Sequence, residues 1–202
     1  MVGGKSVRLG VDKTRLTLGR GRTLLQQVVD SLAEVCQEVI LVGERAYEEV
    51  PAGARAVPDV YPGTGSLGGI YSGLLAATYS HSLAVACDMP FLCRPLLKYM
   101  VERDREYDVL IPCVGDHLEP LHAIYSKQCL GPIQGVLDRG HLKILDFFDQ
   151  VRVRHLEEAE VDRFDPEHRS FLNINTVEEL ANVWVTIYSE LSDGLSTDLR
   201  AD

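Results

Sequence analysis

The side chains best suited to bind a polyphosphate lie in the amino-terminal sequence GGKSVRLGVDK. Gly3 and Gly4 carry no Cβ, so the backbone can approach a bulky ligand there and present its N–H groups to an anion. Lys5, Arg8 and Lys13 add full positive charges. Directed N–H donors together with cations suit a triphosphate. The segment therefore predicts a triphosphate site; the alternative is a surface turn with scattered basic residues.

A carboxylate follows the apolar run in LAVACDMPFL. Asp88 is expected at the carboxyl end of a parallel strand, where open α/β sheets bind ligands. A carboxylate there can hold Mg²⁺, which takes one or two protein oxygens and shares the rest with phosphates and water. Pro90 then redirects the chain. The alternative is that Asp88 caps a helix over residues 90–98.

Three weaker signals accompany this pair of motifs. Asp59 opens the glycine-rich sequence DVYPGTGSLGG, whose backbone could approach a ligand closely. The alternative is that this sequence is a flexible connection. Asn173 and Asn175 lie two apart, on one face of a short extended segment, where they complete a Mg²⁺ shell or cap the next helix. His122 is interpreted as a structural or substrate-lining residue rather than an acid–base catalyst.

Alternating strand and helix patterns must position these residues. Helices are expected at 24–35, 68–79, 95–103, 121–139, 142–148 and 176–191, and strands at 39–42, 82–87, 108–112, 151–155 and 171–174. This rhythm predicts an α/β fold with one doubly wound, mostly parallel sheet. We expect a single domain over residues 1–188 and a polar tail over 189–202.

The position of the glycine turn conflicts with this fold. Such a turn normally follows directly on a strand, but only Met1 and Val2 precede Gly3. Either the usual first strand is lacking, or the natural start lies upstream, or the turn is built differently.

Composition excludes several classes of protein. The 202 residues carry a net charge of −10, which argues against nucleic-acid binding. Residues 1–22, however, hold six cations and one acid, and this basic corner suits an anion. Five cysteines without C-x-x-C spacing predict reduced thiols and a cytoplasmic location. The sequence shows no apolar stretch long enough to span a membrane and no G-x-S-x-G motif. A P-loop ending at Gly4-Lys5-Ser6 would need a further glycine five places before Gly4, so this motif cannot be tested on the sequence.

These motifs occur in one order that resembles the molybdenum cofactor guanylyltransferases. The matching segments are GGKSVRLGVDK, the Asp59 segment with PGTGSLGG, CDMP around Asp88, and NINTVEEL, which begins at Asn173. The resemblance extends from residue 1 to about residue 188. It implies a nucleotidyltransferase fold and transfer of GMP from GTP to the terminal phosphate of molybdopterin, with release of pyrophosphate.

The resemblance also implies roles for individual residues. Met1, Val2, Gly3 and Gly4 hold the nucleotide. Lys13 binds its phosphates, and Asp88 holds Mg²⁺. Asp59 is a further nucleotide-contacting acid, and Asn175 reaches the active site. The expected partners are GTP and molybdopterin, with proteins that deliver or receive the cofactor, and the chain is expected to be a monomer.

Charge neutralisation fits this reaction, because nucleotidyl transfer needs alignment more than covalent help. Lys13 and Arg8 would offset the charge on the leaving pyrophosphate.

The sequence departs from the family pattern in two places: no hydrophobic strand precedes the turn, and the segment Val42–Glu44 lacks an Asn that some members use for the base. Alternatives are therefore a cytidylyl-molybdopterin or nucleotide-sugar synthase, and a non-catalytic GTP-binding module.

Overall fold

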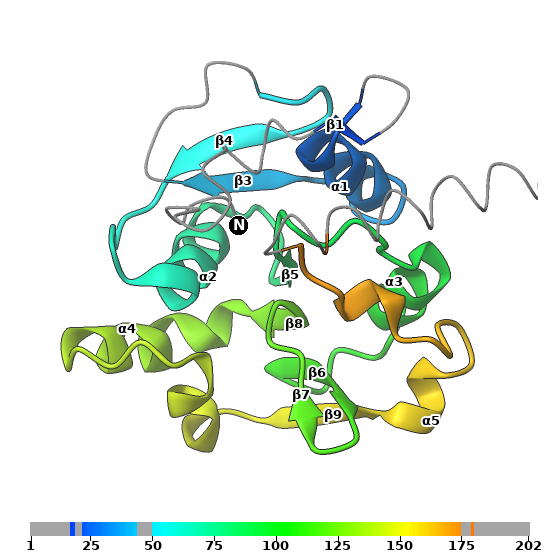
Figure 1. Cartoon of the computed structure of the whole chain (residues 1–202). Coiled ribbons are helices and arrows are strands. Elements are labelled where there is room, and N and C mark those ends of the chain that lie inside the picture. The colour runs from blue at the N-terminus through cyan, green and yellow to red at the C-terminus, as the bar shows by residue number, and fades with distance from the viewer. Residues whose placement is uncertain (1–16, 19–21, 44–49, 175–178, 180–202) are drawn as a thin grey trace, which may run out of the picture.

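The computed structural model describes residues 17–18, 22–43, 50–174 and 179 of the chain (Figure 1). Its helices are α1 (Leu24–Ala33), α2 (Gly65–Ala76), α3 (Arg94–Val101), α4 (Leu130–Asp138) and α5 (Glu158–Val161). Its strands are β1 (Thr17–Leu18), β2 (Arg22–Thr23), β3 (Ile40–Gly43), β4 (Arg55–Pro58), β5 (His81–Val85), β6 (Val109–Val114), β7 (His117–Leu118), β8 (His122–Ser126) and β9 (Val153–Glu157). Short 3₁₀ helices are η2 (Lys127–Cys129), η3 (Ile144–Gln150) and η4 (Arg169–Phe171).

Strand directions confirm the predicted α/β fold. Strands β5 and β6 both run antiparallel to β8, and β9 is parallel to β6, so β5, β6 and β9 share one direction. Strands β3 and β4 form a separate parallel pair. The short β7 and the central β8 run against their neighbours. The larger sheet has the order β5-β8-β6-β7, with β9 on β6.

Helices cover both faces of the larger sheet (Figure 1). Alternate residues of a strand point to opposite faces. Val109 and Tyr125 pack in one core cluster with apolar residues of α2 and α4. Leu110 and Ile124, their immediate neighbours in the chain, pack in another cluster with residues of α3. The sheet is therefore buried from both sides, as in a doubly wound fold.

Several predicted elements are confirmed. Helix α1 begins after Thr23, whose Oγ1 accepts the backbone N–H of Gln26 at 3.2 Å, as the capping motif predicted. Strands β3 and β5, helix α3 and strand β9 lie within a few residues of their expected positions. Helix α2 begins at Gly65, three residues earlier than expected.

The predicted helix over 121–139 is wrong in its first part. His122–Ser126 form strand β8, which pairs with both β5 and β6, and α4 begins only at Leu130. A short apolar run fits a strand or a buried helix equally well by periodicity, and here the two neighbouring strands decide. The expected helix at 142–148 is the 3₁₀ helix η3. The expected strand at 171–174 is also wrong, because η4 ends at Phe171 and irregular chain follows.

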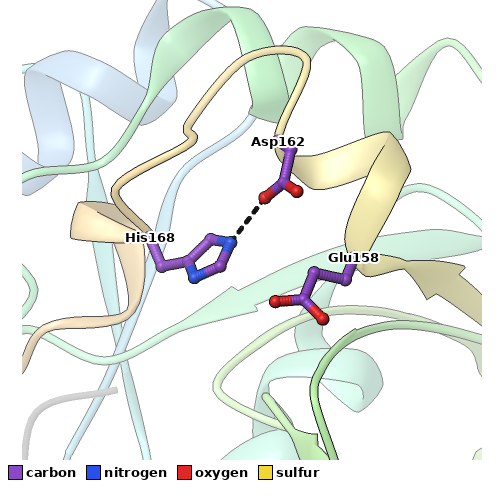
Figure 2. Close-up of side chains that lie close together, drawn as sticks. All are labelled: Glu158, Asp162 and His168. Carbon is purple, nitrogen blue, oxygen red and sulfur yellow. Dashed lines mark hydrogen bonds and ion pairs between the residues drawn. The ribbon is translucent and has the colours of Figure 1, made fainter.

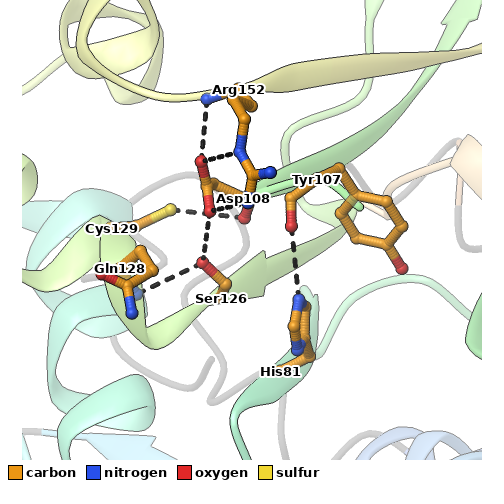
Figure 3. Close-up of polar contacts among 7 residues, drawn as sticks. All are labelled: His81, Tyr107, Asp108, Ser126, Gln128, Cys129 and Arg152. Carbon is orange, nitrogen blue, oxygen red and sulfur yellow. Dashed lines mark hydrogen bonds and ion pairs between the residues drawn. The ribbon is translucent and has the colours of Figure 1, made fainter. Parts of the chain in front are cut away.

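A polar cluster joins β6, β8 and β9 at the edge of the larger sheet where β6 and β9 begin and β8 ends (Figure 3). The carboxylate of Asp108 accepts the backbone N–H of Arg152 at 3.0 Å and two guanidinium N–H groups at 3.0 and 3.1 Å. Ser126 donates its backbone N–H to the Asp108 carbonyl oxygen at 2.7 Å. The bonds from Arg152, its side chain foremost, lower the pKa of Asp108 to about 2. The cluster thereby ties the start of β6 to the end of β8 and to the approach to β9.

Candidate active site

The carboxyl ends of β5, β6 and β9 meet at one edge of the larger sheet, because the three strands share a direction. Strand β8 starts at the same edge, since it runs the opposite way. Open α/β sheets bind ligands outside this edge. Asp88 follows β5 by three residues, so the carboxylate that the sequence singled out lies where a ligand site is expected.

The loop that carries Asp88 is held from three directions. The backbone N–H of Ile174 donates to the Asp88 carbonyl oxygen at 2.9 Å. The Gln27 side chain of α1 donates to the Pro90 carbonyl oxygen at 2.8 Å. The backbone N–H of Cys93 donates to Oγ of the buried Ser170 at 2.8 Å. A half-buried carboxylate on so fixed a loop is well placed to hold a cation in a defined position.

The alternative reading of Asp88 as a helix cap is wrong. Helix α3 begins at Arg94 with Cys93 as its N-cap, so Asp88 precedes the cap position by five residues. Asp88 therefore does not cap the amino terminus of α3.

Asp59 organises the turn between β4 and α2. Its Oδ1 accepts the backbone N–H of Tyr61 at 3.0 Å and lies 2.8 Å from the hydroxyl of Ser72 in α2. The Ser72 Oγ in turn accepts the backbone N–H of Val60 at 3.0 Å. Oδ1 of Asp59 thus helps to hold this turn in place. No hydrogen bond to the other carboxylate oxygen, Oδ2, is found among the described residues.

Glycines are required in the turn that follows Asp59. Gly63 and Gly65 have φ angles of +81° and +68°, which L side chains rarely adopt. A Cβ at Gly68 would lie 1.9 Å from Oγ1 of Thr64 and 2.9 Å from the carbonyl oxygen of Tyr61. The sequence PGTGSLGG therefore forms a defined turn that leads into α2, which begins at Gly65.

A groove of about 520 Å³ adjoins this turn. Residues 63–66 at the start of α2 line one side, and residues 142–146 and Pro120 line the remainder. The amino terminus of a helix attracts anions, and Lys143 contributes a cation to the opposite wall. The groove can accommodate an anionic group, although the sequence pattern did not single out residues 142–146.

His122 begins β8, paired with Val85 of β5 in the strand register. Its side chain is fully buried, and neither ring nitrogen has a hydrogen-bond partner. The ring packs edge-on against Phe171, with centroids 4.9 Å apart. Burial lowers the pKa of His122 to about 4, against the opposing effect of the Asp165 charge. A buried, neutral imidazole agrees with the structural interpretation and not with proton transfer.

A second group of ligand-type side chains, which the sequence reading missed, lies beyond β9 (Figure 2). Ligand atoms of Glu158, Asp162 and His168 all lie within 4.8 Å of one another, and the His168 Nε2 is 2.7 Å from Oδ1 of Asp162. Such a set could hold a divalent cation. Glu158 also accepts the backbone N–H of Gly115 at 3.1 Å. The i, i+4 spacing of Glu158, the first residue of α5, and Asp162, its C-cap, was the available signal.

The remaining predicted site residues lie outside the described part of the chain: Met1, Val2, Gly3, Gly4, Arg8, Lys13 and Asn175. Asp59 and Asp88 are described, and they share no hydrogen bond with each other. They follow strands of different sheets, β4 and β5, which α2 connects. None of the described helices is long and apolar enough to cross a membrane.

Comparison with known proteins places the chain among nucleotide-transferring enzymes. The family model described as the MobA-like NTP transferase domain matches residues 1–157. A probable molybdenum cofactor guanylyltransferase of Pelotomaculum thermopropionicum is 38% identical over 92% of this chain and 90% of that protein. The molybdenum cofactor guanylyltransferase of Desulfosudis oleivorans is 33% identical over 89% of this chain and 90% of its own length.

Solved structures show the same architecture. Molybdopterin-guanine dinucleotide biosynthesis protein A from Archaeoglobus fulgidus superposes with a TM-score of 0.79 at 27% identity and covers 93% of this chain and 96% of its own. The 2-C-methyl-D-erythritol 4-phosphate cytidylyltransferase from Thermus thermophilus gives a TM-score of 0.65 at 18% identity and covers 88% of this chain and 94% of its own. This second likeness concerns the fold alone.

Proposed function

Because the chain belongs to the MobA-like NTP transferase family and is a nucleotidyltransferase, we propose that it transfers GMP from GTP to the terminal phosphate of molybdopterin. Relatives at 38% and 33% identity that bear the name molybdenum cofactor guanylyltransferase support the choice of nucleotide and acceptor. The observation that carries the proposal is the firmly held Asp88 loop at the carboxyl end of β5, in a chain of this family.

The proposed reaction balances without a general base. An oxygen of the acceptor phosphate, already anionic, attacks the α-phosphorus of GTP. A new P–O bond forms, the bond to the β-phosphate oxygen breaks, and pyrophosphate leaves with the electron pair. The protein must therefore align two anions and neutralise charge. Lys13 and Arg8 would do so on the β- and γ-phosphates, and the turn of Met1, Val2, Gly3 and Gly4 would hold the nucleotide.

Asp88 fits a Mg²⁺ site. It is a half-buried carboxylate in a loop fixed by Ile174 and Gln27, and Mg²⁺ is usually bound by one or two carboxylates together with substrate phosphates. Bound there, Mg²⁺ would offset negative charge on the polyphosphate. Asn175 follows Ile174 directly and would supply an amide oxygen nearby. Asp59 would contact the nucleotide through Oδ2, because Oδ1 is already engaged by Tyr61 and Ser72.

The experiment is a pyrophosphate-release assay with molybdopterin, Mg²⁺ and each of the four NTPs. We expect release with GTP. A preference for CTP would replace guanylyl by cytidylyl transfer, and binding of GTP without release under any condition would favour a non-catalytic nucleotide-binding module.

An Asp88→Ala variant tests the metal site. We expect turnover to fall by at least about a hundredfold, while Asp149→Asn, which changes an exposed acid on η3, leaves turnover unchanged. Full activity of the Asp88 variant would contradict the proposed Mg²⁺ role.

A further inference from the structure

One buried carboxylate, Asp165, has no part in the proposed reaction. It is 6% exposed and lies between α5 and η4. In the part of the chain that the structure describes, no salt bridge joins it to a cationic side chain. A buried carboxylate is costly unless hydrogen bonds satisfy its oxygens. The groups that Asp165 accepts therefore indicate what it does.

Each carboxylate oxygen of Asp165 accepts one backbone N–H of η4. Oδ1 accepts the N–H of Arg169 at 3.1 Å, and Oδ2 accepts the N–H of Ser170 at 2.8 Å. The first N–H groups of a helix have no partner inside the helix, and the N-cap residue His168 supplies no side-chain bond to them. Asp165 therefore takes the place of the cap and fixes the backbone of η4.

Ser170 links η4 to the Asp88 loop, which comprises residues 88–93. Its Oγ accepts the backbone N–H of Cys93 at 2.8 Å and donates to the carbonyl oxygen of Phe91 at 3.4 Å. Figure 1 shows the segment that contains η4 in orange beside α3. Because Ser170 is fully buried, water does not replace these bonds. The position of the loop therefore depends on where Asp165 holds Ser170.

Two further bonds join the Asp88 loop to the same part of the chain. Sγ of Cys93 donates to the carbonyl oxygen of Phe164 at 3.3 Å. The backbone N–H of Ile174 donates to the carbonyl oxygen of Asp88 at 2.9 Å. Both ends of the loop are thus bonded to segment 164–174, and η4 lies in the middle of that segment.

We propose that Asp165 is a positioning residue: through η4 and Ser170 it fixes the loop that places the Asp88 carboxylate for Mg²⁺. This proposal rests on the proposed function, which assigns the Mg²⁺ site to Asp88. Mg²⁺ demands near-ideal octahedral geometry, and groups that only orient a metal ligand contribute strongly to metal affinity. A displaced Asp88 loop would therefore bind Mg²⁺ more weakly, although Asp88 itself is unchanged.

The substitution Asp165→Asn separates this role from packing. Asn has nearly the same shape as Asp, but its side chain has one acceptor oxygen, and its NH₂ group would face the second backbone N–H. One of the two bonds to η4 is therefore lost with little change in volume. The matched control is Glu167→Gln, which removes one negative charge from the same segment at an exposed residue that pairs with the Arg169 side chain.

The first measurement is the position of the amide signals in ¹H–¹⁵N NMR spectra of the full chain without nucleotide or metal. In Asp165→Asn we expect the signals of Cys93 and Ile174 to shift, although Asp165 bonds to neither amide, and those of residues 109–111 in β6 to stay in place. Glu167→Gln should shift none of them. Unchanged signals of Cys93 and Ile174 would overturn the proposal, and so would shifts that extend through β6.

The second measurement is the Mg²⁺ dependence of pyrophosphate release. We expect Asp165→Asn to raise the Mg²⁺ concentration that gives the half-maximal rate by about tenfold, with most of the rate restored at saturating Mg²⁺. A purely structural role would reduce the amount of active protein and lower the maximal rate without changing this concentration. That result would also overturn the proposal.

The variant Ser170→Ala tests the same connection with Asp165 left in place. The amide signal of Cys93 should shift, that of Arg169 should not, and the Mg²⁺ requirement should rise as it does in Asp165→Asn; an unchanged requirement would contradict the proposal. The NMR measurement needs no turnover. If the unchanged chain released no pyrophosphate with any NTP while the Cys93 and Ile174 signals shifted as expected, the proposed function would fail and the role of Asp165 in placing the loop would stand.

Discussion

The backbone N–H of Ile174 donates to the carbonyl oxygen of Asp88 at 2.9 Å, across 86 residues of sequence. This bond fixes the loop after β5 to the segment that follows η4. Ser170, on the same segment, holds the same loop at Cys93. The position of Asp88 therefore depends on a distant part of the chain, and the segment 168–174 is part of the framework of the site.

Replacement of Ser170 by Ala should destabilise this framework. The Ser170 Oγ is fully buried and accepts the Cys93 N–H at 2.8 Å, so the variant leaves that donor without a partner. We expect a loss of about 1–3 kcal/mol in the free energy of unfolding, measured in urea. Ser80→Ala, at an exposed position, should change it by less than about 0.5 kcal/mol. Equal effects would contradict the anchoring role.

Replacement of Lys13 by Ala should lower turnover by about two to three orders of magnitude, by analogy with other preorganised charges of this kind. The reason is that Lys13 is proposed to neutralise charge that develops on the leaving pyrophosphate. Steady-state kinetics of pyrophosphate release measure the effect. Lys98→Ala, on an exposed part of α3, is the matched loss of one positive charge. If both variants lost activity equally, net charge rather than position would explain the result.

Replacement of Gly68 by Ala should disturb the turn after Asp59. The new Cβ would lie 1.9 Å from Thr64 Oγ1 and 2.9 Å from the Tyr61 carbonyl oxygen, so the turn must shift. We expect destabilisation of about 1–3 kcal/mol in thermal unfolding. Gly131→Ala in α4, where nothing lies within 4 Å, should instead stabilise by up to about 1 kcal/mol. A neutral Gly68 variant would show that the turn adapts freely.

His122 should make stability depend on pH. Burial lowers its pKa from 6.5 to about 4, so the unfolded chain binds a proton more readily than the folded chain. Its contribution is fully present above about pH 6.5 and is lost as pH falls towards 4, by about 3 kcal/mol in total. His122→Phe keeps a ring against Phe171 without a titrating group. The difference in unfolding free energy between pH 7 and pH 4.5 should be smaller in this variant; an unchanged difference would contradict the assignment.

Asp108 should stabilise the fold mainly above pH 4. Its bonds with Arg152 lower its pKa from 3.8 to about 2, so the stabilisation is present above pH 3.8 and is lost as pH falls towards 2. Asp108→Asn should cost about 1–3 kcal/mol at pH 7 and less at pH 2.5, by urea unfolding. The exposed Asp149→Asn is the control, and an equal cost at both pH values would refute the charge-based explanation.

Local sequence was sufficient for several elements and for the place of Asp88 after β5. Thr23 and Gln26 identified the start of α1, since a helix cap depends on residues three apart. The apolar runs identified β3 and β5, and the expectation that Asp88 lies at the carboxyl end of a strand is confirmed, since Asp88 follows β5 by three residues. These features depend on neighbours in the chain, so the amino-acid pattern determines them.

Tertiary structure decided what depends on distant partners. His122–Ser126 became a strand because β5 and β6 lie on either side, although the run itself fits a helix or a strand. The 2.9 Å bond from Ile174 to Asp88 and the cavity of about 570 Å³ that β3 and β5 line likewise depend on residues far apart in sequence. Local sequence patterns determine the backbone preference of a segment and which of its faces is buried. Hydrogen bonds between strands and loops that are far apart in sequence stabilise the fold only after the chain has brought these segments together.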